Sequence, residues 1–162
     1  MVRFSIGLGV LPLCAMPFGA VAQAEPLFQC TFANGKTVVL ETDETGVVYR
    51  FGRPGQTPEL TLHRLYDQID VTPWPGVGRS IWEDLSLHNG AVTYRLWGAL
   101  DRMSEDHELS AGLIVEQGED ELARLECLPD SINYAVFSFS DAYEAAGYCW
   151  NYEGFIWQEA CE

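Results

Sequence analysis

Basic side chains are scarce in this sequence. Its 162 residues include 9 Lys and Arg against 24 Asp and Glu, so the formal net charge is −15 at pH 7. Nucleic acids and anionic lipids attract proteins through basic groups, so this balance excludes both as expected partners. A strongly acidic surface favours encounter with a cationic partner, and it also serves solubility alone.

Sequence motifs for catalysis or metal binding are absent as well. There is no Gly-x-Ser-x-Gly elbow, no P-loop and no dinucleotide fingerprint. The three histidines, His63, His88 and His107, stand far apart without metal-ligand spacing, and the acidic run at residues 104–108 lacks the pattern of a calcium loop. We therefore predict no catalytic residues, no cofactor and no metal.

Glu83 and Asp84, beside Trp82, are the nearest approach to a glycosidase carboxylate pair. Such a pair must flank one sugar bond. Adjacent residues on a strand point to opposite faces, so these two are not expected to form that pair.

Long apolar runs are missing except at the N-terminus. Residues 4–21 are apolar, Arg3 precedes them, and Ala22-Gln23-Ala24 resembles a cleavage site. This pattern predicts a signal peptide at residues 1–24 and a single β-rich domain at residues 25–162. Loss of Arg3 would change the formal charge from −15 to −16. The mature chain is expected in the periplasm or outside the cell, without stable membrane insertion.

Four cysteines remain after the signal peptide, and an even number in an exported chain predicts two disulfides. Cys30 shares a strand face with Phe28 and Phe32, and Cys127 lies on a face that also looks like core. We therefore expect Cys30 to bond Cys127. Cys149 and Cys161 would then pin the C-terminal tail.

Alternating apolar residues divided by turns predict a mostly β, antiparallel fold. Eight strands in four hairpins are expected between residues 27 and 128, with a further strand at residues 132–139 and a short helix that includes Asp141 and Glu144 and stops at Gly147. We favour an eight-stranded barrel over a sandwich.

The longest predicted hairpin spans residues 73–98. Asn89-Gly90 at its centre is typical of a type I′ turn. Ile81, Leu85 and Leu87 would face the core and Trp82 would face solvent with Trp97 of the partner strand. Exposed aromatics mark binding surfaces. The alternative is that the helix and the aromatic tail cover this face. The candidate binding residues are those of the hairpin end and the aromatic face: Trp82, Asn89, Gly90, Tyr94 and Trp97.

Two segments carry a family resemblance. LFQCTFANGKTVVLETD at residues 27–43 and GLIVEQGEDELARLEC at residues 112–127 resemble the ends of the small secreted inhibitors of C-type lysozyme. The resemblance implies an eight-stranded barrel with an early cysteine bonded to one that ends the last strand. The inhibitory Ser-Gly-x-x-Tyr motif of that family is not matched, because the nearest stretch, from Asn89 to Tyr94, lacks the serine and is one residue longer.

Two functions follow as expectations. The first is an exported, non-enzymatic binding module that inhibits a basic cell-wall lytic enzyme, with a cationic protein such as a lysozyme as partner. The alternative is a glycan-binding protein or a hydrolase acting at the exposed aromatic face.

Overall fold

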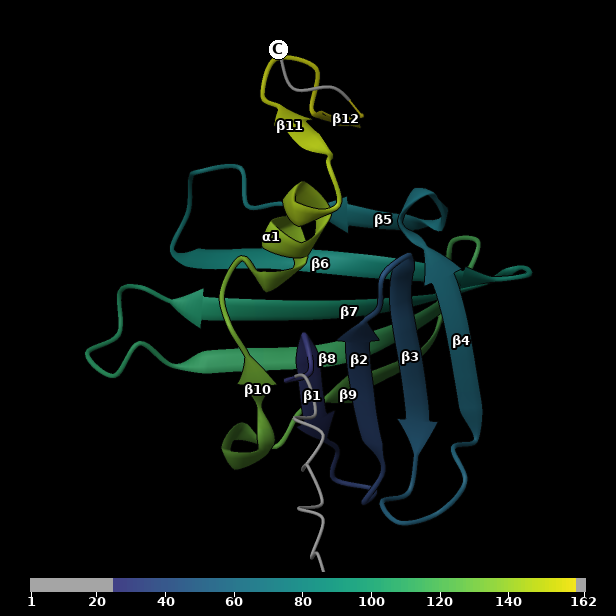
Figure 1. The fold of residues 1–162 in the computed structure, drawn as a ribbon. Coiled ribbons are helices and arrows are strands. Elements are labelled where there is room, and N and C mark those ends of the chain that lie inside the picture. The colour runs from purple at the N-terminus through teal and green to yellow at the C-terminus, as the bar shows by residue number, and fades with distance from the viewer. Residues whose placement is uncertain (1–24, 160–162) are drawn as a thin grey trace, which may run out of the picture.

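Two five-stranded antiparallel sheets pack face to face in the computed structural model, which describes residues 25–159 (Figure 1). The strand orders are β10-β1-β2-β3-β4 and β5-β6-β7-β8-β9, and β11 and β12 form a separate hairpin. The strands of one sheet cross those of the other in Figure 1, as in an orthogonal sandwich. The predicted signal peptide lies outside the described residues.

The elements follow the predicted mostly β pattern. Their bounds are β1 Phe28–Thr31, β2 Thr37–Thr42, β3 Gly46–Gly52, β4 Leu60–Leu65, the 3-10 turn η1 Tyr66–Gln68, β5 Ile69–Thr72, β6 Ser80–Asn89, β7 Val92–Asp101, β8 Leu109–Gln117, β9 Asp120–Glu126, the 3-10 turn η2 Pro129–Ser131, β10 Asn133–Tyr134, α1 Ser138–Ala145, β11 Cys149–Asn151 and β12 Ile156–Gln158. No helix within residues 25–159 is long and apolar enough to cross a membrane.

The barrel prediction is wrong, and the sandwich alternative describes the fold. A barrel needs ladder hydrogen bonds at every seam. Here β1 and β9 meet through one isolated bridge, Phe32 to Cys127, and β4 and β5 belong to different sheets. Between β4 and β5 the chain forms the 3-10 turn η1, which leads it from the first sheet into the second.

The Cys30–Cys127 disulfide is confirmed, with Cα atoms 5.7 Å apart. It joins the two sheets beside the Phe32 bridge, inside a core that both sheets supply. The shared face of Phe28, Cys30 and Phe32 is buried, as their alternation predicts. The predicted Cys149–Cys161 bond includes Cys161, which lies outside the described residues.

In the β6–β7 hairpin the strand faces are as expected, but the turn lies one residue later in the chain. Asn89 pairs with Val92, so Gly90 and Ala91 are the two loop residues. Gly90 has φ 63°, whereas Asn89 and Ala91 do not have positive φ. The type I′ expectation is therefore wrong, because only the first loop residue takes the left-handed conformation, as in a type II′ turn.

Some strands were missed and one was overextended. β5 lies within a stretch predicted as a loop, and β11 and β12 lie in the tail. The predicted strand at residues 132–139 ends after two residues as β10, because Phe137 takes φ 74° and α1 begins at Ser138. The predicted short helix is present, but it begins at Ser138, three residues before the expected start at Asp141.

Glu83 supplies the N-terminal cap of α1 from another element. The helix has no side-chain cap of its own. The Glu83 carboxylate, fully buried on the inner face of β6, accepts hydrogen bonds from the Phe139 amide at 2.8 Å and the Ser140 amide at 3.0 Å. The Ser140 hydroxyl donates at 2.7 Å and the Tyr134 hydroxyl at 3.0 Å. A carboxylate at a helix N-terminus satisfies free amides and complements the helix dipole.

Gly98 makes room for this arrangement. It pairs with Glu83 across β6 and β7, and a Cβ atom there would lie 2.3 Å from the Tyr134 ring. Tyr134 therefore packs directly on the backbone of β7 while its hydroxyl reaches the carboxylate.

We predict that Glu83→Gln lowers the free energy of unfolding by about 1–3 kcal/mol, because the amide NH₂ would oppose a backbone N–H that now has an acceptor. Urea unfolding measures this loss. Glu105→Gln is the matched control, since Glu105 is exposed, and it should change stability by less than about 0.5 kcal/mol.

The loss should also depend on pH. Desolvation raises the pKa of Glu83 above its ordinary 4.5, against the lowering effect of its hydrogen bonds. The folded chain then binds this proton at a higher pH than the unfolded chain, so the contribution of Glu83 is greatest below about pH 4.5 and falls as pH rises through the folded pKa. The Glu83→Gln penalty should be larger at pH 4 than at pH 8. A penalty that grows with pH would contradict this assignment.

Candidate functional site

The predicted aromatic face lies on the outer side of the second sheet. Trp82 of β6 and Trp97 of β7 are both half-buried there. Trp97 pairs with Asp84 on one side and with Gly112 of β8 on the other, and a Cβ atom on Gly112 would lie 2.7 Å from the Trp97 Nε1 atom. The indole therefore lies close over the backbone of β8 at Gly112.

The five predicted binding residues do not share one surface. Asn89 and Gly90 are exposed at the hairpin end. Tyr94 points to the inner face, where its ring packs 5.7 Å from that of Tyr49. The structure thus brings Trp82 and Trp97 to one face and separates Tyr94 from them.

Side chains on the outer face around Trp97 are more buried than those of a sheet face that is open to solvent. Arg95 forms an ion pair with Glu116, and the Arg95 Nε and Trp97 Nε1 atoms are buried without a hydrogen-bond partner among the described residues. Desolvation raises the pKa of Asp84. The N-terminus of helix α1 meets Glu83 on the opposite, inner face of β6. This end of the helix therefore does not cover Trp82 and Trp97.

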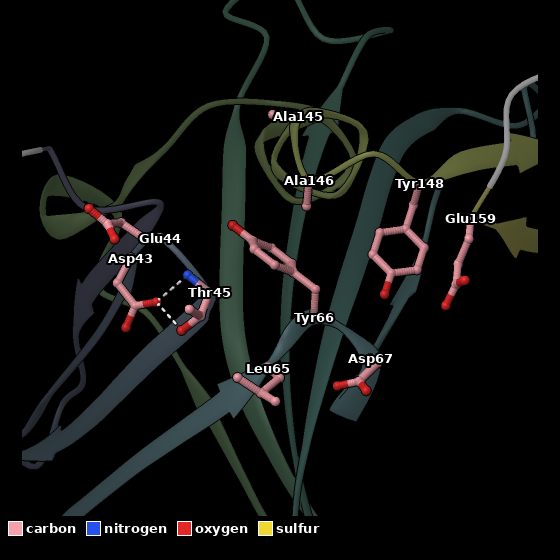
Figure 2. A pocket seen from close by; sticks show the side chains of 10 residues that line it. All are labelled: Asp43, Glu44, Thr45, Leu65, Tyr66, Asp67, Ala145, Ala146, Tyr148 and Glu159. Atoms are coloured by element: carbon pink, nitrogen blue, oxygen red, sulfur yellow. Dashed lines mark hydrogen bonds between the residues drawn. The ribbon is translucent and has the colours of Figure 1, made fainter.

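A cleft of about 580 Å³ opens where four separate segments meet (Figure 2). The segments are the β2–β3 turn, the end of β4 with η1, the C-terminus of α1, and the chain around β12. Four carboxylates and two tyrosine rings stand in its wall, and no Lys, Arg or His is among the described residues that line it. The lining residues are Asp43, Glu44, Thr45, Leu65, Tyr66, Asp67, Ala145, Ala146, Tyr148 and Glu159.

Asp43 is held ionised at one side of this cleft. Its Oδ1 atom accepts hydrogen bonds from the Thr45 amide at 2.8 Å and the Thr45 hydroxyl at 2.9 Å. These bonds are the main reason that the pKa of Asp43 falls to about 2. Its other oxygen lies 2.8 Å from His63 Nε2. The charge of Asp43 therefore persists at every physiological pH.

Two tyrosines of the cleft, Tyr66 and Tyr148, lie close to its carboxylates. In Figure 2 the Tyr66 ring lies between the turn that carries Asp43 and the side that carries Tyr148 and Glu159. Burial raises the pKa of Tyr66, and Asp43 raises it further. Burial also raises the pKa of Tyr148, with Glu159 and Asp67 adding to the effect. The C-terminal end of α1 at Ala145 and Ala146 adds the negative end of a helix dipole.

This combination is suited to an organic cation. Carboxylates attract an ammonium or guanidinium group, and tyrosine faces bind it through cation–π contact. Among residues 25–159, no group of three His, Cys, Asp or Glu side chains is arranged to hold a metal ion. The carboxylates are thus spread around the cleft rather than gathered at one point.

Sequence reasoning missed this cleft because its residues come from positions 43–45, 65–67, 145–148 and 159, which no motif links. One signal was available. The sequence has no Lys, Arg or His after Arg124, whereas seven acidic residues follow it.

No family model matches the chain, and neither the curated proteins nor the solved structures contain a match.

Trp97→Ala should lower the free energy of unfolding by about 2 kcal/mol, because the half-buried indole covers the backbone at Gly112. Chemical denaturation measures the loss. Should Trp97→Ala be as stable as the parent protein, the indole does not support the sheet, and the outer face would again be the first place to seek a ligand.

Proposed function

We propose that this protein is an exported, non-enzymatic binding module that docks a cationic partner protein, and that basic cell-wall lytic enzymes such as lysozymes are its partner class. The cleft that contains Asp43, Asp67 and Glu159 carries the proposal. Its negative potential and tyrosine walls complement Lys and Arg side chains on such a partner.

The location of the basic residues supports a local rather than a uniform negative field. Five of them form ion pairs with carboxylates on the two large sheets or their connecting loops, and none of these pairs lies in the cleft. The pairs are Lys36 with Glu59, Arg50 with Glu41, Arg79 with Asp101, Arg95 with Glu116 and Arg124 with Glu121. Asp43 is paired with His63, whereas Glu44, Asp67 and Glu159 form none of these ion pairs and remain available to a partner.

The disulfide supports export. Cys30 and Cys127 are bonded between the sheets, and such bonds form and persist in oxidising compartments. The periplasm and the extracellular space also contain the proposed partner class.

The decisive experiment measures binding to a basic C-type lysozyme. The double variant Asp67→Asn/Glu159→Gln removes two charges from the cleft, and Glu105→Gln/Asp106→Asn removes two exposed charges from the β7–β8 loop. We expect the cleft variant to weaken binding about fivefold, equal to about 1 kcal/mol, and to reduce the salt dependence of the dissociation constant. The loop control should change affinity less than twofold.

Two outcomes would contradict the proposal. Absence of binding at low ionic strength would remove the partner class. Equal weakening by both variants would mean that net charge, and not the cleft, governs the encounter. Lysozyme activity measured in the same titration shows whether binding also inhibits the enzyme.

A further inference from the structure

The β11–β12 hairpin exposes a compact group of large apolar side chains. Tyr152 is 74% exposed, Phe155 66% and Ile156 53%, and all three lie within five consecutive residues. Single exposed apolar residues are ordinary, but contiguous ones mark interaction surfaces. We call this group the hairpin tip.

The base of the hairpin is firmly attached. The Trp157 indole N–H donates to the carbonyl of Val71 on β5 at 2.8 Å. Its ring packs edge-on against Trp150 at 5.2 Å and against Tyr143 of α1 at 4.9 Å. Figure 1 shows the hairpin projecting beyond α1 from this anchored base. The tip is thus held beyond α1 and beside β5.

The turn itself is ordered by a side chain. Asn151 Oδ1 accepts hydrogen bonds from the amides of Glu153 and Gly154, both at 2.9 Å. A surface ordered before binding loses less conformational entropy when a partner docks.

Phe155 occupies a backbone conformation that phenylalanine rarely adopts. Its φ is 52°, whereas the neighbouring Gly154 does not have a positive φ. The left-handed region favours glycine and is unfavourable for a bulky side chain. Strain of this kind clusters at functional sites.

A groove of about 370 Å³ lies between the tip and β5. Trp150, Phe155 and Ile156 line it with apolar side chains, Asp70 and Thr72 of β5 add polar groups, and Asp70 is bonded to His88. The chain after Arg124 supplies carboxylates and no basic group. Exposed apolar side chains on a segment that carries carboxylates and no basic group complement an apolar side chain flanked by basic ones.

We propose that the hairpin tip and this groove bind an apolar side chain that the partner presents between Lys or Arg residues. The inference rests on the proposed function, because the same cationic partner would fill the acidic cleft and the groove. The groove supplies apolar anchoring, and the cleft supplies electrostatic attraction.

The test uses two short lysine-rich peptides that differ only at the central residue, leucine in one and serine in the other. Binding is measured by fluorescence polarisation of labelled peptides. The parent protein should bind the leucine peptide about tenfold more tightly, since one leucine buries a full apolar side chain. Phe155→Gly should abolish that preference and leave the serine peptide unaffected.

A matched control is present in the chain. Phe137 is also a phenylalanine at positive φ, 74°, and is 38% exposed at the start of α1. Phe137→Gly should keep the leucine preference. The melting temperature of Phe155→Gly should not fall, because glycine relieves the left-handed conformation, so lost binding cannot be attributed to unfolding.

The outcomes separate the two proposals. If the parent protein binds both peptides equally, or if Phe155→Gly keeps the preference, the hairpin inference is wrong and cation binding stands. If neither peptide binds at low ionic strength, the proposed function fails and the hairpin inference fails with it.

Discussion

The hydrogen-bonded carboxylate of Glu83 fixes the helix on which the rest of the surface depends. A buried carboxylate without a cation costs several kcal/mol in desolvation. Here four donors and the start of α1 offset part of that cost. Glu83 fixes the N-terminal end of α1, and the other end of this short helix, which stops before Gly147 at φ 98°, forms one wall of the acidic cleft. An interaction in the core thus places a feature of the surface.

Tyr143 connects helix α1 with the wall of the acidic cleft and with the base of the β11–β12 hairpin. Its hydroxyl lies 2.6 Å from the carbonyl oxygen of Tyr66 and 3.0 Å from that of Ile69. Burial raises the pKa of Tyr143 to about 12, so the hydroxyl keeps its proton and remains a donor. Its ring stacks on Tyr148 at 4.5 Å and meets Trp157 edge-on. The cleft wall and the base of the hairpin therefore share one aromatic contact, and a partner that touches both would meet a single rigid unit.

The sequence predicted local features better than it predicted whether the sheets close into a barrel. Alternation identified the strands and their faces, and the shared phase of Cys30 and Cys127 identified the disulfide, because side-chain direction is a local property. The barrel prediction is wrong because β4 and β5 do not pair. Their separation depends on the path of η1, which no local pattern encodes. β5 was missed because four residues followed by Pro73 resemble a loop. The role of Glu83 was hidden because its donors lie more than fifty residues away. The cleft was hidden for the same reason, since it draws single side chains from distant segments.

The uneven use of charge is the feature that stability alone does not account for. Exposed like charges repel only weakly, by a fraction of a kcal/mol each, so an acidic surface is tolerable. Even so, a fold under selection for stability would gain by placing a lysine or arginine near Asp67 or Glu159, where two further carboxylates of the cleft also stand. The chain instead pairs basic side chains with carboxylates on the large sheets and their loops, and supplies none after Arg124. The aromatic contacts of Tyr143 and Trp157 hold that acidic segment in place without neutralising it. A fold that anchors a segment without Lys, Arg or His through aromatic packing keeps the negative field intact, as the cationic partner that we propose would require.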